Sequence, residues 1–211
     1  MIVSPDQSIY LASRSPRRRD LLNQIGIRFS QLFLRMQPES DPDTNEDPRG
    51  GERPEAYVER LARAKALAGW NRIRQRQLPR APVLAADTTV ALENRIFGKP
   101  ADRREAAQML GALGGRWHDV YTAIVLRYDE RIESALSRTL VQFRALDDDE
   151  IARYIATGEA DDKAGAYGIQ GRAAQFVIEI RGSYSGVMGL PLYETAELLQ
   201  RMAAGHERRQ R

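Results

Sequence analysis

The sequence predicts an α/β fold in a single domain. Segments with a strand-like pattern alternate along the chain with segments of helical periodicity, and this alternation is typical of α/β proteins. The 211 residues are close to the usual size of one domain, and no repeat, low-complexity tract or linker divides them. We therefore assign residues 1–211 to one domain that ends in a frayed basic tail at residues 205–211.

The first half of the chain predicts short strands and helices in alternation. Ser15 is a favoured N-cap and Pro16 a favoured first helical residue, and Gly26 is placed to end the helix that they open. A polar stretch without periodicity follows, and long loops of this kind inside compact domains are often functional. In order, we predict a strand at 8–13, a helix at 16–25, a strand at 27–34, a surface loop at 36–53, a helix at 54–74 and an apolar strand at 82–93.

The second half predicts a strand hairpin between helices that have clear start signals. Asp102 with Glu105, and Asp147 with Glu150, have the spacing of a capping box, which marks the start of a helix. Glycines end both helices. The predicted order is a turn at 93–95, a helix at 102–113, strands at 117–127 and 131–144, a helix at 147–158, a glycine-rich stretch at 165–171, a strand at 176–180, a Gly/Ser loop at 182–189 and a final helix from Pro191.

Composition and charge exclude several classes of protein. No apolar run approaches the ~18 residues that a membrane-spanning helix needs, and residues 1–13 lack the basic start of a secretory signal. The absence of cysteine excludes disulfides and thiolate catalysis, and two histidines leave little material for a zinc site. A formal net charge of only +3 argues against a nucleic-acid coat despite a sequence pI of about 9.3. We therefore expect a cytoplasmic protein whose partners include neither a membrane nor a nucleic acid.

The basic residues are divided unevenly between arginine and lysine. Of the 32 basic residues only Lys65, Lys99 and Lys163 are lysines, a skew that codon bias produces by turning interchangeable surface lysines into arginines. A position that keeps lysine then needs a compact, flexible ammonium group rather than a planar guanidinium. The skew marks these three positions as candidate site residues. The alternative is that three lysines remain by chance.

Residues 13–19, SRSPRRR, combine a helix start with hydroxyl and guanidinium groups. The free amides and the positive dipole end of a helix form an anion site. Ser13 and Ser15 add hydroxyl donors to it, and Arg17 and Arg18 add forks that suit phosphate. The alternative is an ordinary N-cap followed by a solvated basic turn. The convergence of four such side chains on one helix start favours the phosphate site.

Asp87 lies inside a strongly apolar strand. An unpaired carboxylate there carries a desolvation cost of several kcal/mol, so something must compensate it. A divalent cation or a neighbouring lysine would do so, and either makes Asp87 a candidate metal ligand or general base. Lys99 follows the predicted turn and can return to the same strand end. The structural alternative, an aspartate that caps a loop at the strand end, is disfavoured by the apolar residues that follow.

The glycine-rich segment 159–171 places polar side chains among small residues. Glycine lets the backbone approach a ligand closely, and the amide of Gln170 offers both a donor and an acceptor to a nucleobase edge. The alternative reading is a flexible loop with turn residues, which is the commoner case. The segment matches no P-loop, whose signature is absent from the chain.

Taken together, these segments resemble the Maf family of nucleoside triphosphate pyrophosphatases over residues 10–199. The matching motifs are LASRSPRR at 11–18, RLARAKA at 60–66, AADTTV at 85–90, GKP at 98–100, HDVYTA at 118–123, DKAGAYGIQG at 162–171 and GLPLYET at 189–195. The last two resemble the branch that acts on dTTP and UTP rather than the branch that acts on 7-methylguanosine triphosphate. The family fold is similar to that of inosine triphosphatases. The resemblance therefore implies an elongated mixed sheet flanked by helices, two lobes around a cleft, and a homodimer.

The resemblance also implies an activity and a site. The activity is hydrolysis between the α and β phosphates, which releases a nucleoside monophosphate and pyrophosphate with the help of Mg or Mn. Asp87 would be the proton acceptor that activates water, and a metal ligand. The residues implied in triphosphate binding are Ser13, Arg17, Arg18, Lys65, Lys99 and Lys163, and those implied in base preference are Arg17, Thr88 and Gln170.

One position departs from the family pattern. The family usually has an acidic residue nine positions after the residue that matches Phe29, and here that position is Pro38. Glu39, or else Asp41, would then take over as the second metal ligand.

Two other functions compete with this prediction. A non-catalytic regulator of septum formation and cell division would bind nucleotides without turning them over. An RNA-binding module, suggested by the pI, would need an arginine patch interleaved with aromatic residues, and the sequence has none.

Overall fold

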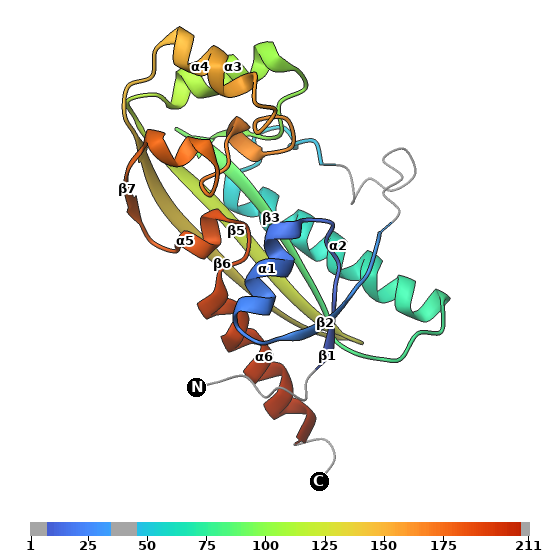
Figure 1. Cartoon of the computed structure of the whole chain (residues 1–211). Coiled ribbons are helices and arrows are strands. Elements are labelled where there is room, and N and C mark those ends of the chain that lie inside the picture. Colours follow the sequence, from blue (N-terminus) through green and yellow to red (C-terminus); the bar gives the residue numbers. More distant parts are fainter. Residues whose placement is uncertain (1–7, 35–45, 208–211) are drawn as a thin grey trace.

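The computed structural model describes residues 8–34 and 46–207, which form one mixed sheet with helices on both faces (Figure 1). β1 is parallel to β2 and β3, whereas every other strand pair is antiparallel. The strand order is β2-β1-β3-β5-β6-β7, with β4 paired to β3. The strands are β1 (Ser8–Leu11), β2 (Arg28–Gln31), β3 (Val83–Leu92), β4 (Arg95–Phe97), β5 (Trp117–Tyr128), β6 (Arg131–Phe143) and β7 (Val177–Arg181). The predicted α/β class and mixed sheet are confirmed.

The helices cover the sheet because successive residues of a strand point to opposite faces. Ala85 of β3 packs under α2 (Pro54–Gln75), whereas Ala86 packs on the side of α1 (Pro16–Gln24) and α6 (Leu192–Glu207). A third apolar cluster contains residues of α3 (Arg103–Leu113) and α4 (Asp148–Ile155), which lie at the other end of the molecule (Figure 1). It also contains residues of the short helices η1 (Ala164–Ala166) and η2 (Arg172–Phe176). The two clusters on either face of β3 form the core of one lobe, and the third cluster forms the core of the other. No helix in residues 8–34 and 46–207 is long and apolar enough to cross a membrane.

Local signals place most helix ends where the sequence predicts them. Asp147 and Glu150 form a complete capping box at the start of α4. At the start of α3, the side chain of Asp102 accepts a hydrogen bond from the amide of Glu105 over 2.7 Å. In the turn between β3 and β4, Asn94 adopts a φ of 66°, a conformation that asparagine tolerates better than most residues.

The predicted Gly/Ser loop at 182–189 contains a single helical turn, α5 (Tyr184–Val187). Ser183 is its N-cap, and its hydroxyl accepts a hydrogen bond from the amide of Gly186 over 3.0 Å. The amide of Ser183 in turn donates to the hydroxyl of Thr139 on β6 over 2.9 Å. The sequence predicted the loop but not the helical turn within it, which a cap and a contact with β6 stabilise.

The sheet has an open edge at the middle of β3. β5 pairs with one edge of β3 from Val83 to Ala91. On the other edge, β1 reaches only Leu84, and β4 begins to pair at Val90. Within the described part of the chain, no strand pairs with residues 86–89 on that edge. The gap therefore leaves one backbone edge beside Asp87 and Thr88 without a strand partner, between the two lobes.

Candidate active site

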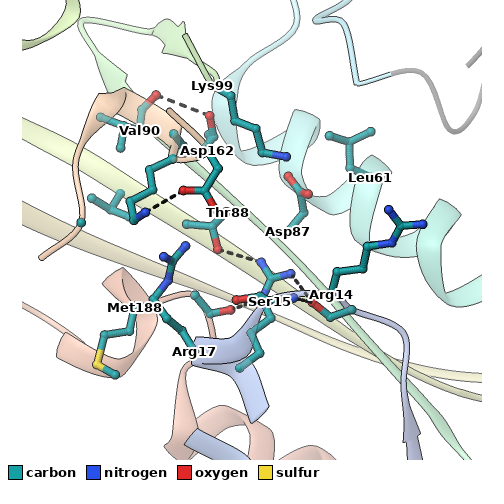
Figure 2. Close-up of a pocket in the computed structure, with 18 of the residues that line it drawn as sticks. Arg14, Ser15, Arg17, Leu61, Asp87, Thr88, Val90, Lys99, Asp162 and Met188 are labelled. Carbon is teal, nitrogen blue, oxygen red and sulfur yellow. Dashed lines mark hydrogen bonds and ion pairs between the residues drawn. The ribbon is translucent and has the colours of Figure 1, made fainter. Parts of the chain in front are cut away.

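A cavity of about 440 Å³ opens beside this gap. It is lined by the end of β1, the start of α1, the middle of β3 and the glycine-rich segment, so both lobes contribute to it (Figure 2). Its volume falls within the ~300–1,000 Å³ that is typical of small-molecule sites. The predicted cleft between two lobes is therefore present at the gap in the sheet.

Lys65 of α2 joins two carboxylates at one side of the cavity. Its Nζ lies 2.6 Å from Oδ1 of Asp87 and 2.8 Å from Oε1 of Glu46. Asp87 is only 8% exposed, so this contact provides the compensation that a buried carboxylate needs. The sequence predicts that Lys99 returns to this strand end, but the lysine that contacts Asp87 is Lys65, and Lys99 pairs with Glu46 instead. The alternative of an aspartate capping a loop is wrong because Asp87 lies within β3.

Glu46 belongs to the polar loop that precedes α2. Its backbone carbonyl accepts a hydrogen bond from the hydroxyl of Tyr57 over 2.7 Å, which fixes this end of the loop against α2. Its Oε2 lies 3.9 Å from Nζ of Lys99, whose side chain is 62% exposed. Glu46 thus stands between two of the three lysines of the chain.

Burial and charge adjust the acidity of this cluster. Burial raises the pKa of Asp87, although the charge of Lys65 opposes the shift. Burial also acts to lower the pKa of Lys65, but the charges of Asp87 and Glu46 outweigh it and raise that pKa. For Glu46, burial is outweighed by Lys65, which lowers the pKa. Asp87 is therefore a stronger proton acceptor than an ordinary surface aspartate, while Glu46 stays anionic.

Arg18 of α1 connects three walls of the cavity. Its Nε donates to the carbonyl of Gly189 over 2.7 Å, its Nη1 to Oγ of Ser13 over 3.3 Å and its Nη2 to Oγ1 of Thr88 over 3.3 Å. Burial lowers the pKa of Arg18, and the charge of Asp87 opposes this effect. The guanidinium is held in one orientation, so the solvated basic turn is wrong for this arginine.

The start of α1 leaves its amides open to a ligand. Ser15 occupies the N-cap position as predicted, but its side chain makes no capping hydrogen bond. Its own amide donates to Oγ of Ser13 over 3.1 Å. Since the first amides of a helix have no partner within the helix, those of α1 at the cavity wall are available to an anion.

Gly165 lets the glycine-rich segment approach the opposite side of the cavity. It has a φ of 68°, and a Cβ at this position would lie 2.8 Å from Cγ2 of Val90. Its amide donates to the carbonyl of Gly98 over 3.1 Å, which joins the segment to the residue before Lys99. Lys163 lines the cavity and makes an ion pair of 2.6 Å with Asp162.

A buried histidine joins this segment to the sheet. Nε2 of His118 on β5 lies 2.9 Å from the hydroxyl of Tyr167. Burial lowers the pKa of His118 to about 4, so the imidazole is neutral at pH 7. His118 therefore serves as a neutral hydrogen-bonding link to the glycine-rich segment.

The structure brings the predicted site residues together. Those that line the cavity are Ser13, Arg17, Arg18, Lys65, Asp87, Thr88, Lys99, Lys163 and Gln170. Glu39, predicted as a metal ligand, lies outside the described residues, as does Asp41. Lining a cavity does not by itself test a chemical role, and the individual roles stay predictions.

Sequence reasoning missed Glu46. It is one of six acidic residues in the polar loop, the others being Glu39, Asp41, Asp43, Asp47 and Glu52, and no periodicity or motif distinguishes them. The contact that identifies Glu46 is its ion pair with Lys65, which depends on where α2 lies over β3.

A family model and the curated relatives of the chain identify one family. The family model described as Maf-like protein matches residues 8–202. A protein of Aromatoleum aromaticum named dTTP/UTP pyrophosphatase is 58% identical, covering 91% of this chain and 94% of its own length. One of the same name from Nitrosomonas europaea is 54% identical, covering 95% and 97%. Among solved structures, the Staphylococcus aureus Ham1 protein has a TM-score of 0.41 and 14% identity, covering 65% of this chain and 72% of its own. Because the family model and these relatives span nearly the whole chain, the protein belongs to the Maf family.

Proposed function

We propose that the protein is a nucleoside triphosphate pyrophosphatase that hydrolyses dTTP and UTP to the monophosphate and pyrophosphate. The observation that carries this proposal is the position of a buried carboxylate, Asp87, beside a cavity that also contains Arg18 and the open start of α1. A proton acceptor and an anion site are thus next to each other. Phosphoanhydride hydrolysis needs this combination. The shared name of the relatives indicates which bases are accepted.

The charged groups around the cavity have different roles in the reaction. A triphosphate carries close to four negative charges, and Arg17, Arg18, Lys99 and Lys163 supply positive charge around the cavity. Asp87 takes a proton from the attacking water. The oxygen of that water forms a bond to the α phosphorus, while the bond from this phosphorus to the bridging oxygen of the pyrophosphate breaks. Lys65 donates a hydrogen bond to Oδ1 of Asp87 and so orients the carboxylate.

Asp87 and Glu46 fit a divalent cation such as Mg or Mn. No group of three or more His, Asp or Glu side chains that could hold a metal occurs among residues 8–34 and 46–207. Mg is commonly bound by one or two carboxylates together with substrate phosphates, and both carboxylates here contact the same ammonium group. When bound, the cation neutralises phosphate charge and polarises the phosphoryl group.

The function is tested by pyrophosphate release from a panel of triphosphates with Mg or Mn. We expect turnover of dTTP and UTP, and slower turnover of CTP, ATP and GTP. Nucleotide binding without any turnover would contradict the proposal and would instead support the nucleotide-binding regulator.

The metal site is tested by Glu46→Gln beside Glu39→Gln, which changes the ligand that the sequence predicts in the same loop. We expect Glu46→Gln to raise the metal concentration that gives half-maximal activity by at least ~10–100-fold, the range found when even an outer partner of a metal ligand is lost. Glu39→Gln is expected to leave it unchanged. Calorimetric titration with Mn gives a second measurement that does not depend on turnover. The reverse pattern would restore Glu39 as the ligand.

A homodimer and a cytoplasmic location stay proposals. Ile132 and Leu136, on the part of β6 that β7 does not pair with, are apolar and exposed, and a second copy of the chain would cover them. Sedimentation velocity gives the oligomeric state directly.

A further inference from the structure

Hydrogen bonds connect Arg18 through two threonine hydroxyls to a backbone carbonyl. Nη2 of Arg18 donates to Oγ1 of Thr88 over 3.3 Å, and Oγ1 of Thr88 lies 2.9 Å from Oγ1 of Thr122. Oγ1 of Thr122 donates to the carbonyl of Gly186 over 2.8 Å. The two threonines are direct partners in the register of β3 and β5. Thr122 is only 1% exposed, whereas Thr88 lines the cavity (Figure 2).

The groups at the two ends of this hydrogen-bond chain, Arg18 and the carbonyl of Gly186, fix the direction in which each hydroxyl donates. A carbonyl oxygen only accepts, so the single proton of the Thr122 hydroxyl points to Gly186. Oγ1 of Thr122 must then accept from Thr88, which commits the proton of Thr88. At the other end, a guanidinium only donates, so Arg18 occupies one lone pair of Thr88. What Thr88 has left for a ligand is one lone pair, and it acts only as an acceptor.

Both ends of the hydrogen-bond chain are anchored in the segment 182–189. The carbonyl of Gly186 is held in place because it also accepts a hydrogen bond from the amide of Gly189 over 2.9 Å. Arg18 is held because its Nε donates to the carbonyl of Gly189 over 2.7 Å. The polarity of Thr88 is therefore set before a ligand arrives.

We propose that Thr122 is a positioning residue that keeps the hydroxyl of Thr88 as an acceptor, and that this acceptor selects uracil and thymine against cytosine. The proposal rests on the proposed pyrophosphatase function and on the role in base preference that the resemblance to the Maf family implies for Thr88. Uracil and thymine carry a hydrogen on N3, which an acceptor binds. Cytosine has a lone pair on N3, so the two acceptors would face each other with no proton between them. Such a mismatch leaves buried polar groups unpaired, which is a strong basis for discrimination.

The same polarity distinguishes the base from the triphosphate as the partner of Thr88. Phosphate oxygens are acceptors, and an acceptor-only hydroxyl does not bind them. The cavity offers phosphate better partners in Arg17, Lys99 and Lys163. Thr88 therefore serves the end of the substrate that carries donors.

The test measures kcat/KM for UTP and for CTP in Thr122→Val. Valine has nearly the shape of threonine but neither donates nor accepts, so the hydroxyl of Thr88 becomes free to turn and donate. We expect the UTP-to-CTP ratio of kcat/KM to fall by about tenfold or more, through both a lower value for UTP and a higher value for CTP. Thr122→Ser restores the hydroxyl and is expected to restore the ratio. Should the valine variant fail to fold, as judged by circular dichroism, Thr122→Ala replaces it.

Thr139→Val is the matched control for the segment itself. Thr139 bonds to Ser183 through its hydroxyl but does not touch Thr88, so its loss loosens the same segment and leaves the polarity of Thr88 unchanged. We expect a normal UTP-to-CTP ratio in this variant. An unchanged ratio in Thr122→Val, an equal change in Thr139→Val, or a wild type that does not prefer UTP would each overturn the inference. Absence of UTP turnover in the wild type would instead contradict the proposed function.

Discussion

Replacing Asp87 by asparagine is expected to lower kcat for UTP hydrolysis by about 10²- to 10⁴-fold, the usual contribution of a positioned general base. The amide of asparagine has the shape of the carboxylate and accepts a hydrogen bond from Lys65, but it does not take a proton from water. The fold is therefore expected to survive, and circular dichroism checks this. Asp119→Asn is the matched control, because Asp119 pairs with Arg138 on the sheet and does not line the cavity.

The pH dependence provides a second view of Asp87. The base works only when it is ionised, so the rate falls as the pH drops through the pKa of Asp87. Burial raises that pKa above the ordinary 3.8 of aspartate, so the acidic limb of the kcat profile is expected above that value. Asp87→Asn should lose this limb. Full activity in Asp87→Asn would refute the role of Asp87 as proton acceptor.

The change Lys65→Arg is expected to lower kcat/KM by about 100-fold, the scale of loss that a misplacement of about 1 Å produces at a reacting centre. The Nζ of Lys65 contacts two carboxylates at 2.6 and 2.8 Å, and its side chain is only 15% exposed. A guanidinium is longer and planar, so it displaces Asp87 or Glu46 although the charge is kept. Steady-state kinetics with UTP and a thermal unfolding curve separate lost activity from lost fold.

Lys99→Arg is the comparison for this change. The side chain of Lys99 is 62% exposed and 3.9 Å from Glu46, so an arginine has room to adjust. We expect a smaller loss of activity than at Lys65, with the fold intact. If both variants keep the wild-type rate, codon usage alone explains the scarcity of lysine.

Features that depend on neighbouring residues could be predicted from the sequence. The capping box of Asp147 and Glu150 forms in the structure because its hydrogen bonds join residues three positions apart. The hairpin of β5 and β6 follows from two strand-like runs joined by a polar turn at Asp129 and Glu130. The gathering of Asp87 and the three lysines at one cavity follows in the sequence from the resemblance to the Maf family. The desolvation argument predicts only that Asp87 needs a partner.

Other features of the site could not be predicted because their partners are distant in the sequence. Glu46 and Lys65 are joined across a loop whose acidic residues look alike, so only the packing of α2 over β3 selects one of them. Thr122 lies within the matched motif HDVYTA, but nothing local shows that its hydroxyl faces Thr88 and Gly186.

The α/β class, most helix starts, the family resemblance and nine of the residues that line the cavity could be predicted from the sequence. These features depend on periodicity, capping residues and the order of motifs, all of which can be recognised from residues that are close together in the sequence. Only the folded chain shows which carboxylate accompanies Asp87, how Arg18 reaches a carbonyl 171 residues away, and which way the hydroxyl of Thr88 points. The physical reason is that an ion pair or a hydrogen bond forms only within a few ångströms. Those distances between remote segments exist only once the sheet, its open edge at β3 and the two lobes are assembled.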